Sequence, residues 1–159
     1  MKNTKENRTV KVSIDNICQY AGFLPSTSDM EQWIRLCREP NEPLILHVRL
    51  VDQDESQSLN ATFRKKDKPT NILSFIEASI PGSPADQLGT LVICPEIIEY
   101  EYNHADKNAQ DHWAHIIIHG TLHLLGYDHE NDHDAEIMEA KEIEILKTLG
   151  IHNPYQTNG

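Results

Sequence analysis

Alternation of apolar and polar residues predicts two half-buried strands in the first third of the chain. Their apolar positions are Val10, Val12 and Ile14 in the first, and Leu44, Leu46, Val48 and Leu50 in the second. Because successive side chains of a strand point to opposite faces, each segment presents one apolar face to a core. Residues 71–75 and 89–94 are predicted to form two further strands. The stretch at 81–84 between them contains proline and glycine and is predicted to be a surface loop.

Apolar residues recur at helical spacing in five other segments. In the first, Ser28 and Glu31 have the spacing of a capping box, and a helix is expected to follow and to end before Pro40. Its apolar face consists of Met30, Trp33, Ile34 and Cys37. The other helices are predicted over residues 55–65, with Leu59 and Phe63 facing inward, and over residues 95–102, 109–125 and 132–149.

This succession of strands and helices indicates an α/β or α+β fold in which a small sheet is covered by helices. The 159 residues are enough for a single domain with a hydrophobic core. We assign residues 1–9 to a flexible N-terminus, residues 10–150 to the domain and residues 151–159 to a C-terminal tail.

The charge of the chain is strongly acidic but unevenly distributed. Its formal net charge is −11, which argues against a protein that holds nucleic acid by bulk charge. Yet residues 64–68 contain four of the 14 basic residues, whereas residues 128–144 contain many acids.

No apolar run approaches the roughly 20 residues of a membrane helix, and no signal peptide is visible. Three widely spaced cysteines without a CxxC pair fit reduced thiols, so a cytoplasmic protein is expected.

Three histidines in the stretch HGTLHLLGYDH have the spacing of a metal site. His119 and His123 are one helical turn apart, so both imidazoles leave the same face and can bind one ion. Gly126 is expected to end the helix in a left-handed turn, which brings His129 back as a third ligand. Three imidazoles leave a fourth position open, which is typical of a catalytic site for one zinc ion.

Two nearby residues have less certain roles. His115 shares the helical spacing, but eight helical residues rise about 12 Å, whereas metal–nitrogen bonds are about 2.1 Å long. His115 is therefore expected to be packed or exposed rather than a ligand. For Asp128 the sequence leaves three roles open: an acceptor that orients a ligand imidazole, a general base, or a solvated turn residue.

Two long blocks of the sequence resemble the YbeY endoribonucleases. Residues 59–75, LNATFRKKDKPTNILSF, are similar to that family's LNxxYRxKDxPTNVLSF, with Phe63 where tyrosine is common. HGTLHLLGYDH is similar to its zinc motif. Residues 88–94, LGTLVIC, resemble its LGDIVI strand, with Thr90 in place of the frequent aspartate. The resemblance extends in matching order over about residues 10–150.

The resemblance implies a bacterial, cytoplasmic, zinc-dependent endoribonuclease specific for single-stranded RNA. It implies roles in 3′-end maturation of small-subunit ribosomal RNA and in ribosome quality control, with the ribosomal small subunit or its proteins as partners and no membrane. A small mixed four-stranded sheet with about five helices around it is also implied. The implied zinc ligands are His119, His123 and His129, and catalysis is assigned to His119 and Arg64. The expected RNA-binding residues are Arg64, Lys65, Lys66 and Lys68.

Two alternatives remain open at this stage. A metallopeptidase would share the histidine spacing, because metzincins have H-E-x-x-H-x-x-G-x-x-H; Gly120 here replaces their general base and counts against it. A noncatalytic ribosome-assembly factor with structural zinc is disfavoured by the open fourth position. In a nuclease, zinc-activated water could replace the missing base, either as nucleophile or by deprotonating the RNA 2′-hydroxyl.

Overall fold

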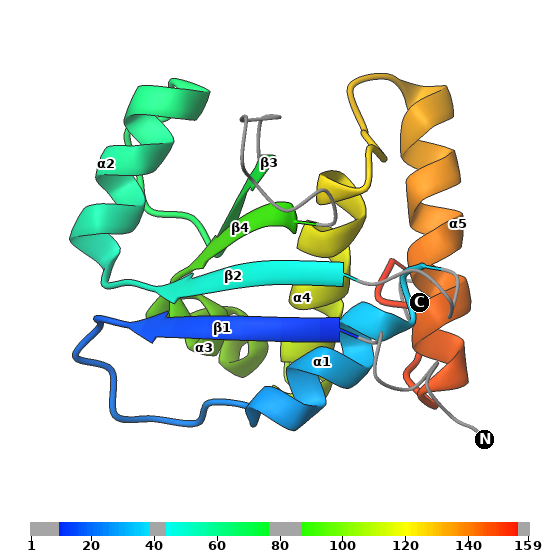
Figure 1. Ribbon diagram of the computed structural model, residues 1–159, viewed down its shortest axis with the longest axis horizontal. Coiled ribbons are helices and arrows are strands. Elements are labelled where there is room, and N and C mark those ends of the chain that lie inside the picture. The colour runs from blue at the N-terminus through cyan, green and yellow to red at the C-terminus, as the bar shows by residue number, and fades with distance from the viewer. Residues whose placement is uncertain (1–9, 39–43, 77–86, 156–159) are drawn as a thin grey trace.

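The computed structural model describes residues 10–38, 44–76 and 87–155, which form one four-stranded sheet and five helices (Figure 1). The strands are β1 (Val10–Asn16), β2 (Leu44–Leu50), β3 (Ile72–Ile76) and β4 (Gln87–Ile93). The helices are α1 (Thr27–Arg35), α2 (Gln53–Arg64), α3 (Pro95–His104), α4 (Ala109–Leu124) and α5 (Asp132–Thr148). The predicted flexible N-terminus and the predicted loop at 81–84 lie outside the described residues, and the predicted tail is described as far as Tyr155.

The sheet is mixed, as expected, with the strand order β1-β2-β4-β3. β1, β2 and β4 are parallel, whereas β3 runs antiparallel to β4 at one edge, with Ser74 opposite Leu91. Parallel neighbours require long crossover connections, and these are supplied here by the helices. The edge strand β3 comes directly after α2 and its basic segment, which places that segment beside the edge of the sheet (Figure 1).

Alternate residues of β4 serve two separate cores. Leu91 and Ile93 are fully buried in the main core, together with residues of α1, α4 and α5. Val92, on the opposite face, packs with Leu73 of β3 and with Leu59 of α2. This alternation follows from the two-residue period of a strand and explains why residues 91–93 of β4 are all apolar.

Helix α4 is the central helix of the fold and touches α1, α3, α5, β3 and β4. Its core residues include Trp113, Ile117 and Leu122, all with no exposed surface. A helix held on so many sides gives rigid support to the histidines that it carries. Among the described residues, no helix combines the length and the apolar character that crossing a bilayer requires.

Two local predictions were wrong. The N-cap of α1 is Ser26, whose hydroxyl accepts a hydrogen bond from the backbone N–H of Asp29 at 3.0 Å, so Ser28 lies within the helix. The carboxylate of Glu31, which a capping box would turn back to the start of the helix, accepts instead from the backbone N–H of Val12. Phe63 does not face inward: it is 54% exposed and meets only the edge of the second core through an edge-to-face contact with Phe75.

Candidate functional site

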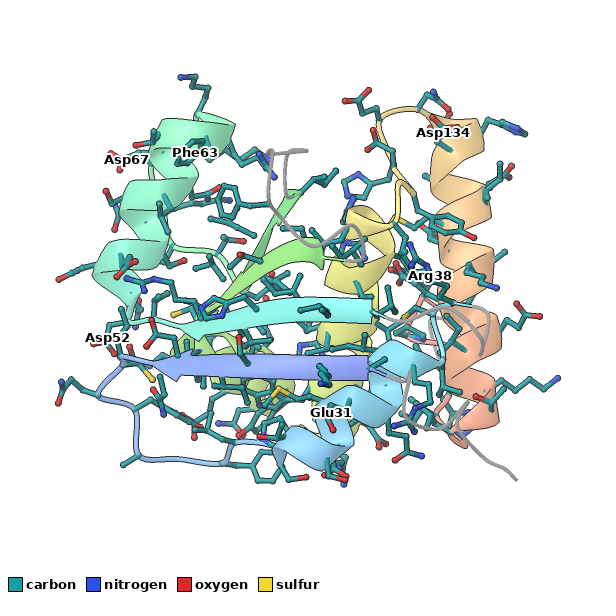
Figure 2. All side chains as sticks on the ribbon, viewed as in Figure 1. Glu31, Arg38, Asp52, Phe63, Asp67 and Asp134 are labelled. Carbon is teal, nitrogen blue, oxygen red and sulfur yellow. The ribbon has the colours of Figure 1, made fainter. Side chains whose placement is uncertain are left out.

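A cavity of about 920 Å³ is enclosed by two parts of the chain that are distant in sequence. One wall consists of the end of α2, the segment after it and β3, including Arg64, Lys66 and Ser74. The other wall consists of α4 and the turn after it, including His119 and the residues up to Glu130. Figure 2 shows Phe63 and Asp67 at the α2 side and Asp134 at the start of α5 on the other side. The sheet edge β3 lies between the two sides (Figure 1).

His119, His123 and His129 come together in this cavity, and one ligand atom from each lies within 4.8 Å of the others. The ring of His123 is 4.7 Å from each of the other two rings, centroid to centroid. Gly126 makes the approach possible, because its φ of 105° is the left-handed conformation that ends α4. The N–H of Gly126 donates to the carbonyl of His123 and that of Tyr127 donates to the carbonyl of Leu122, which together form a Schellman motif.

Hydrogen bonds determine which nitrogen of two of these rings carries the proton. Nδ1 of His119 lies 2.6 Å from the carboxylate of Glu142, and Nδ1 of His123 lies 3.1 Å from the backbone carbonyl of Tyr127. An ionised carboxylate and a carbonyl only accept, so both Nδ1 atoms donate in the neutral rings. Nε2 of each ring therefore keeps a lone pair for a metal.

The ring of His123 is kept neutral by its surroundings. Burial, followed by the proximity of His119 and His129, lowers the pKa of His123 to about 4. A metal binds the neutral imidazole, so this ring needs no deprotonation before binding at neutral pH. The three residues thus fit a metal ion in number and in atom type, and nitrogen ligands suit zinc better than the oxygen-seeking Mg²⁺ or Ca²⁺.

Glu142 of α5 is a candidate site residue that the sequence analysis did not identify. Its side chain has no exposed surface, and its carboxylate accepts from His119, from His115 Nε2 at 3.1 Å and from the hydroxyl of Tyr155. Burial alone would raise the pKa of Glu142, but the hydrogen bonds from His115 and His119 lower it to about 2. Glu142 is therefore an ionised carboxylate bonded to His119, which is the usual kind of partner for a histidine that binds a metal.

The structure explains why glycine stands where metzincins have glutamate. Gly120 is buried where α4 lies against the sheet. A Cβ atom at this position would lie 2.5 Å from Cδ1 of Ile72, 3.0 Å from Cδ2 of Leu91 and 3.2 Å from the hydroxyl of Ser74. There is consequently no room for a carboxylate side chain at residue 120.

Arg64 is held at the mouth of the cavity by the edge strand. One terminal nitrogen donates to the carbonyl of Ser74 at 3.2 Å, and the guanidinium carbon lies 5.8 Å from the ring centre of Phe75. The hydroxyl of Ser74 in turn donates to the carbonyl of Gly120 at 3.0 Å, which links Arg64 to the histidine helix. A guanidinium has five N–H groups, so donors remain available for an anion.

The three lysines predicted to bind RNA lie in different places. Lys66 and Lys68 line the cavity, and the buried amide of Asn60 supports them by donating to the carbonyl of Lys68 at 2.9 Å. Lys65 is not among the lining residues; its ammonium group donates to the carbonyl of Thr62 at 3.2 Å. Asn71 lines the cavity and donates to the carboxylate of Glu101.

The remaining candidates near the site have defined partners. Asp128 lines the cavity, and its carboxylate accepts from the backbone N–H of His129 at 2.7 Å, so it shapes the turn that carries the third ligand. His115 is packed against Glu142 and Tyr155, as expected for a residue outside the ligand set. His112 is buried and bonded to Glu101 at 2.8 Å.

Comparison with known proteins agrees with this geometry. Residues 11–150 match the model of a family described as endoribonuclease YbeY. The fold is similar to the solution structure of TM1509 from Thermotoga maritima, with a TM-score of 0.56. The two chains are 22% identical, and the match covers 92% of this chain and all of the other, so this likeness supports the fold alone.

Proposed function

This chain belongs to the YbeY endoribonuclease family, and on that premise we propose that it is a zinc-dependent nuclease that cleaves single-stranded RNA. We assign it to 3′-end maturation of small-subunit ribosomal RNA and to ribosome quality control, in the cytoplasm. The observation that carries the proposal is the shared cavity, in which Arg64 and Lys66 face His119, His123 and His129. A cationic side chain and a metal ion can each stabilise the negative charge that develops when a phosphodiester is cleaved, so the two walls suit this reaction together.

Arg64 is the residue proposed to hold the scissile phosphate. Cleavage of a phosphodiester concentrates negative charge on its non-bridging oxygens. The planar guanidinium of Arg64 can donate to two of these oxygens at once, which the ammonium group of a lysine does not do with the same geometry. The Ser74 carbonyl keeps the guanidinium at the cavity mouth before RNA arrives, so little ordering is needed on binding.

The histidines are proposed to hold one zinc ion and to keep it accessible. His119 and His123 present Nε2, because their Nδ1 atoms donate to Glu142 and to the Tyr127 carbonyl. His129 is exposed and completes the set from the turn. When bound, a zinc ion at this point would supply Lewis-acid stabilisation of the developing charge. Asp128 lines the same cavity. Its carboxylate accepts from the backbone N–H of His129, and we propose that this bond keeps His129 in place.

RNA affinity must come from local charge, because the net charge of −11 repels a polyanion. Lys66 and Lys68 line the cavity together with Arg64, so these three side chains supply its positive charge. Lys65 is proposed to contact RNA backbone beyond the cavity. A short track of this kind gives weak, salt-dependent binding. We therefore propose that the ribosomal small subunit or its proteins deliver the single-stranded ribosomal RNA substrate.

The two alternatives are less well supported. A metzincin-type peptidase requires a carboxylate at residue 120, where the packing against Ile72 and Leu91 leaves no room. A structural zinc site would be closed by a fourth protein ligand. Here the histidines open into a cavity of about 920 Å³ instead.

The test is cleavage of a labelled single-stranded ribosomal RNA fragment by the wild type and by His119→Ala, with metal content measured on both. His133→Ala is the matched control, since His133 is an exposed histidine outside the cavity lining. Loss of cutting in His119→Ala alone, with zinc in the wild type and the control, would support the proposal. Equal cutting by all three proteins would mean that a contaminating ribonuclease is responsible, and zinc-dependent cleavage of casein would instead favour the peptidase.

A further inference from the structure

Tyr155 lies beyond the family-matched residues and yet lines the cavity. Its hydroxyl donates to the carboxylate of Glu142 and lies 3.3 Å from Nε2 of His115. Its ring stands edge-on to the ring of His115, with the centroids 5.5 Å apart. Together with His119, which also donates to this carboxylate, three donors from α4 and from the segment after α5 converge on one buried carboxylate of α5.

The path of the chain after α5 delivers Tyr155 to this point in defined steps. Gly150 adopts a left-handed φ of 77°, and Ile151 donates its N–H to the carbonyl of Leu146, so the helix ends in a Schellman motif. Ile151 then packs against the main core. Finally, the side chain of Asn153 accepts from the backbone N–H of Tyr155 at 2.8 Å and closes a turn. The segment is therefore ordered by its own contacts as far as Tyr155.

The donors around Glu142 are divided between its two oxygens. Oε1 receives the Tyr155 hydroxyl and His115, whereas Oε2 receives Nδ1 of His119 at 2.6 Å. A fully buried carboxylate is costly unless all its lone pairs find donors. Saturating Oε1 fixes the plane of the carboxylate, and the fixed plane then determines where Oε2 meets His119.

We propose that Tyr155 is a positioning residue of the metal centre, which acts through Glu142 to orient the imidazole of His119 and so raises the affinity of the site for metal. The inference rests on the metal site of the proposed function, but not on RNA cleavage. It also makes residues 151–155, expected to be only a tail, a part of the site.

The test compares metal affinity, measured by chelator competition with Zn²⁺ and with Co²⁺ as a spectroscopic probe, in four full-length proteins. These are the wild type, Tyr155→Phe, Glu142→Gln and the double variant. Partners of metal ligands change affinity by roughly 10- to 100-fold, so we expect a loss in that range for Glu142→Gln and about tenfold for Tyr155→Phe. If Tyr155 acts through Glu142, the double variant should bind no more weakly than Glu142→Gln alone.

Tyr100→Phe is the matched control, because Tyr100 is an exposed tyrosine on α3 outside the cavity lining. It should keep both the wild-type affinity and the wild-type Co²⁺ absorption spectrum, whereas the ligand-field bands of Tyr155→Phe should shift. Melting curves of the metal-free proteins check that the variants are folded.

Wild-type affinity and an unchanged Co²⁺ spectrum in Tyr155→Phe would overturn the inference, and so would losses that simply add in the double variant. A wild type that binds metal but cuts no RNA would overturn the proposed function and leave this inference standing. A wild type that binds no metal would overturn both.

Discussion

Gly120→Ala tests how closely α4 lies against β3. Helix propensity alone favours alanine over glycine by about 0.8–1.0 kcal/mol. Against this, the added Cβ would lie 2.5 Å from Cδ1 of Ile72 and 3.0 Å from Cδ2 of Leu91, and overpacking a filled core costs roughly 1–3 kcal/mol. The end of Ile72 can turn aside, but Leu91 is fully buried. The balance of these terms predicts that Gly120→Ala lowers the free energy of unfolding by about 1 kcal/mol.

Urea unfolding of the metal-free protein measures this change without the contribution of metal binding to stability. Ile72→Val removes Cδ1, the atom nearest to the new methyl group, and should cost about 0.5–1.5 kcal/mol by itself. In the double variant the new methyl group occupies the vacated space. The combined loss should therefore be smaller than the sum of the single losses by about 1 kcal/mol. A Gly120→Ala protein more stable than the wild type, with effects that add to those of Ile72→Val, would refute the close approach.

Further predictions concern the cavity, a thiol and a helix end. Arg64→Ala and Arg64→Lys should both retain zinc while RNA cleavage falls by roughly 10²- to 10³-fold, the usual cost of losing a transition-state donor; loss of zinc in either variant would contradict the role of Arg64. Burial raises the pKa of Cys37 to about 12, so at pH 8 a thiol reagent should modify the partly exposed Cys18 in the folded protein and spare Cys37. Mass spectrometry that finds Cys37 modified before unfolding would argue against its burial. Asn131→Ala should destabilise the protein by about 0.5–2 kcal/mol in urea unfolding, because Asn131 caps α5 by accepting from the N–H of Asp134. An unchanged midpoint would show that another group caps this helix.

The order and type of the elements could be predicted because both are encoded in local periodicity. The alternation in residues 44–50 predicted strand β2, and the proline at 95 predicted the start of helix α3. The start of α1 was harder to place, since Ser26 and Ser28 can both cap a helix. In the structure Ser26 accepts from the N–H of Asp29, and Glu31 bonds to strand β1, a contact that the local sequence does not show.

The histidine cluster could also be predicted from local sequence. One helical turn separates His119 from His123, and Gly126 ends the helix so that His129 folds back towards them. Glu142 could not be found in this way. In the sequence it is one of many acids between residues 128 and 144, and only a weak pattern separates this buried acid from the solvated ones. Only the packing of α5 on α4 places it behind His119, 23 residues away along the chain. A weak signal existed, since Ile145 and Leu146 extend the apolar face of α5 on which Glu142 lies.

The two walls of the cavity are also separated in the order of synthesis. The wall that carries Arg64 and β3 is complete by residue 76, whereas the wall that carries the histidines extends from residue 115 to Tyr155. Because a protein is made from its N-terminus, the wall proposed to hold phosphate is synthesised before the wall proposed to bind metal. A nascent chain that ends before Glu142 has the three histidines but lacks the carboxylate that orients His119. The order of translation thus postpones the assembly of the proposed centre until residue 155 has been made, so the growing chain lacks a complete site for most of the time that it is built beside ribosomal RNA.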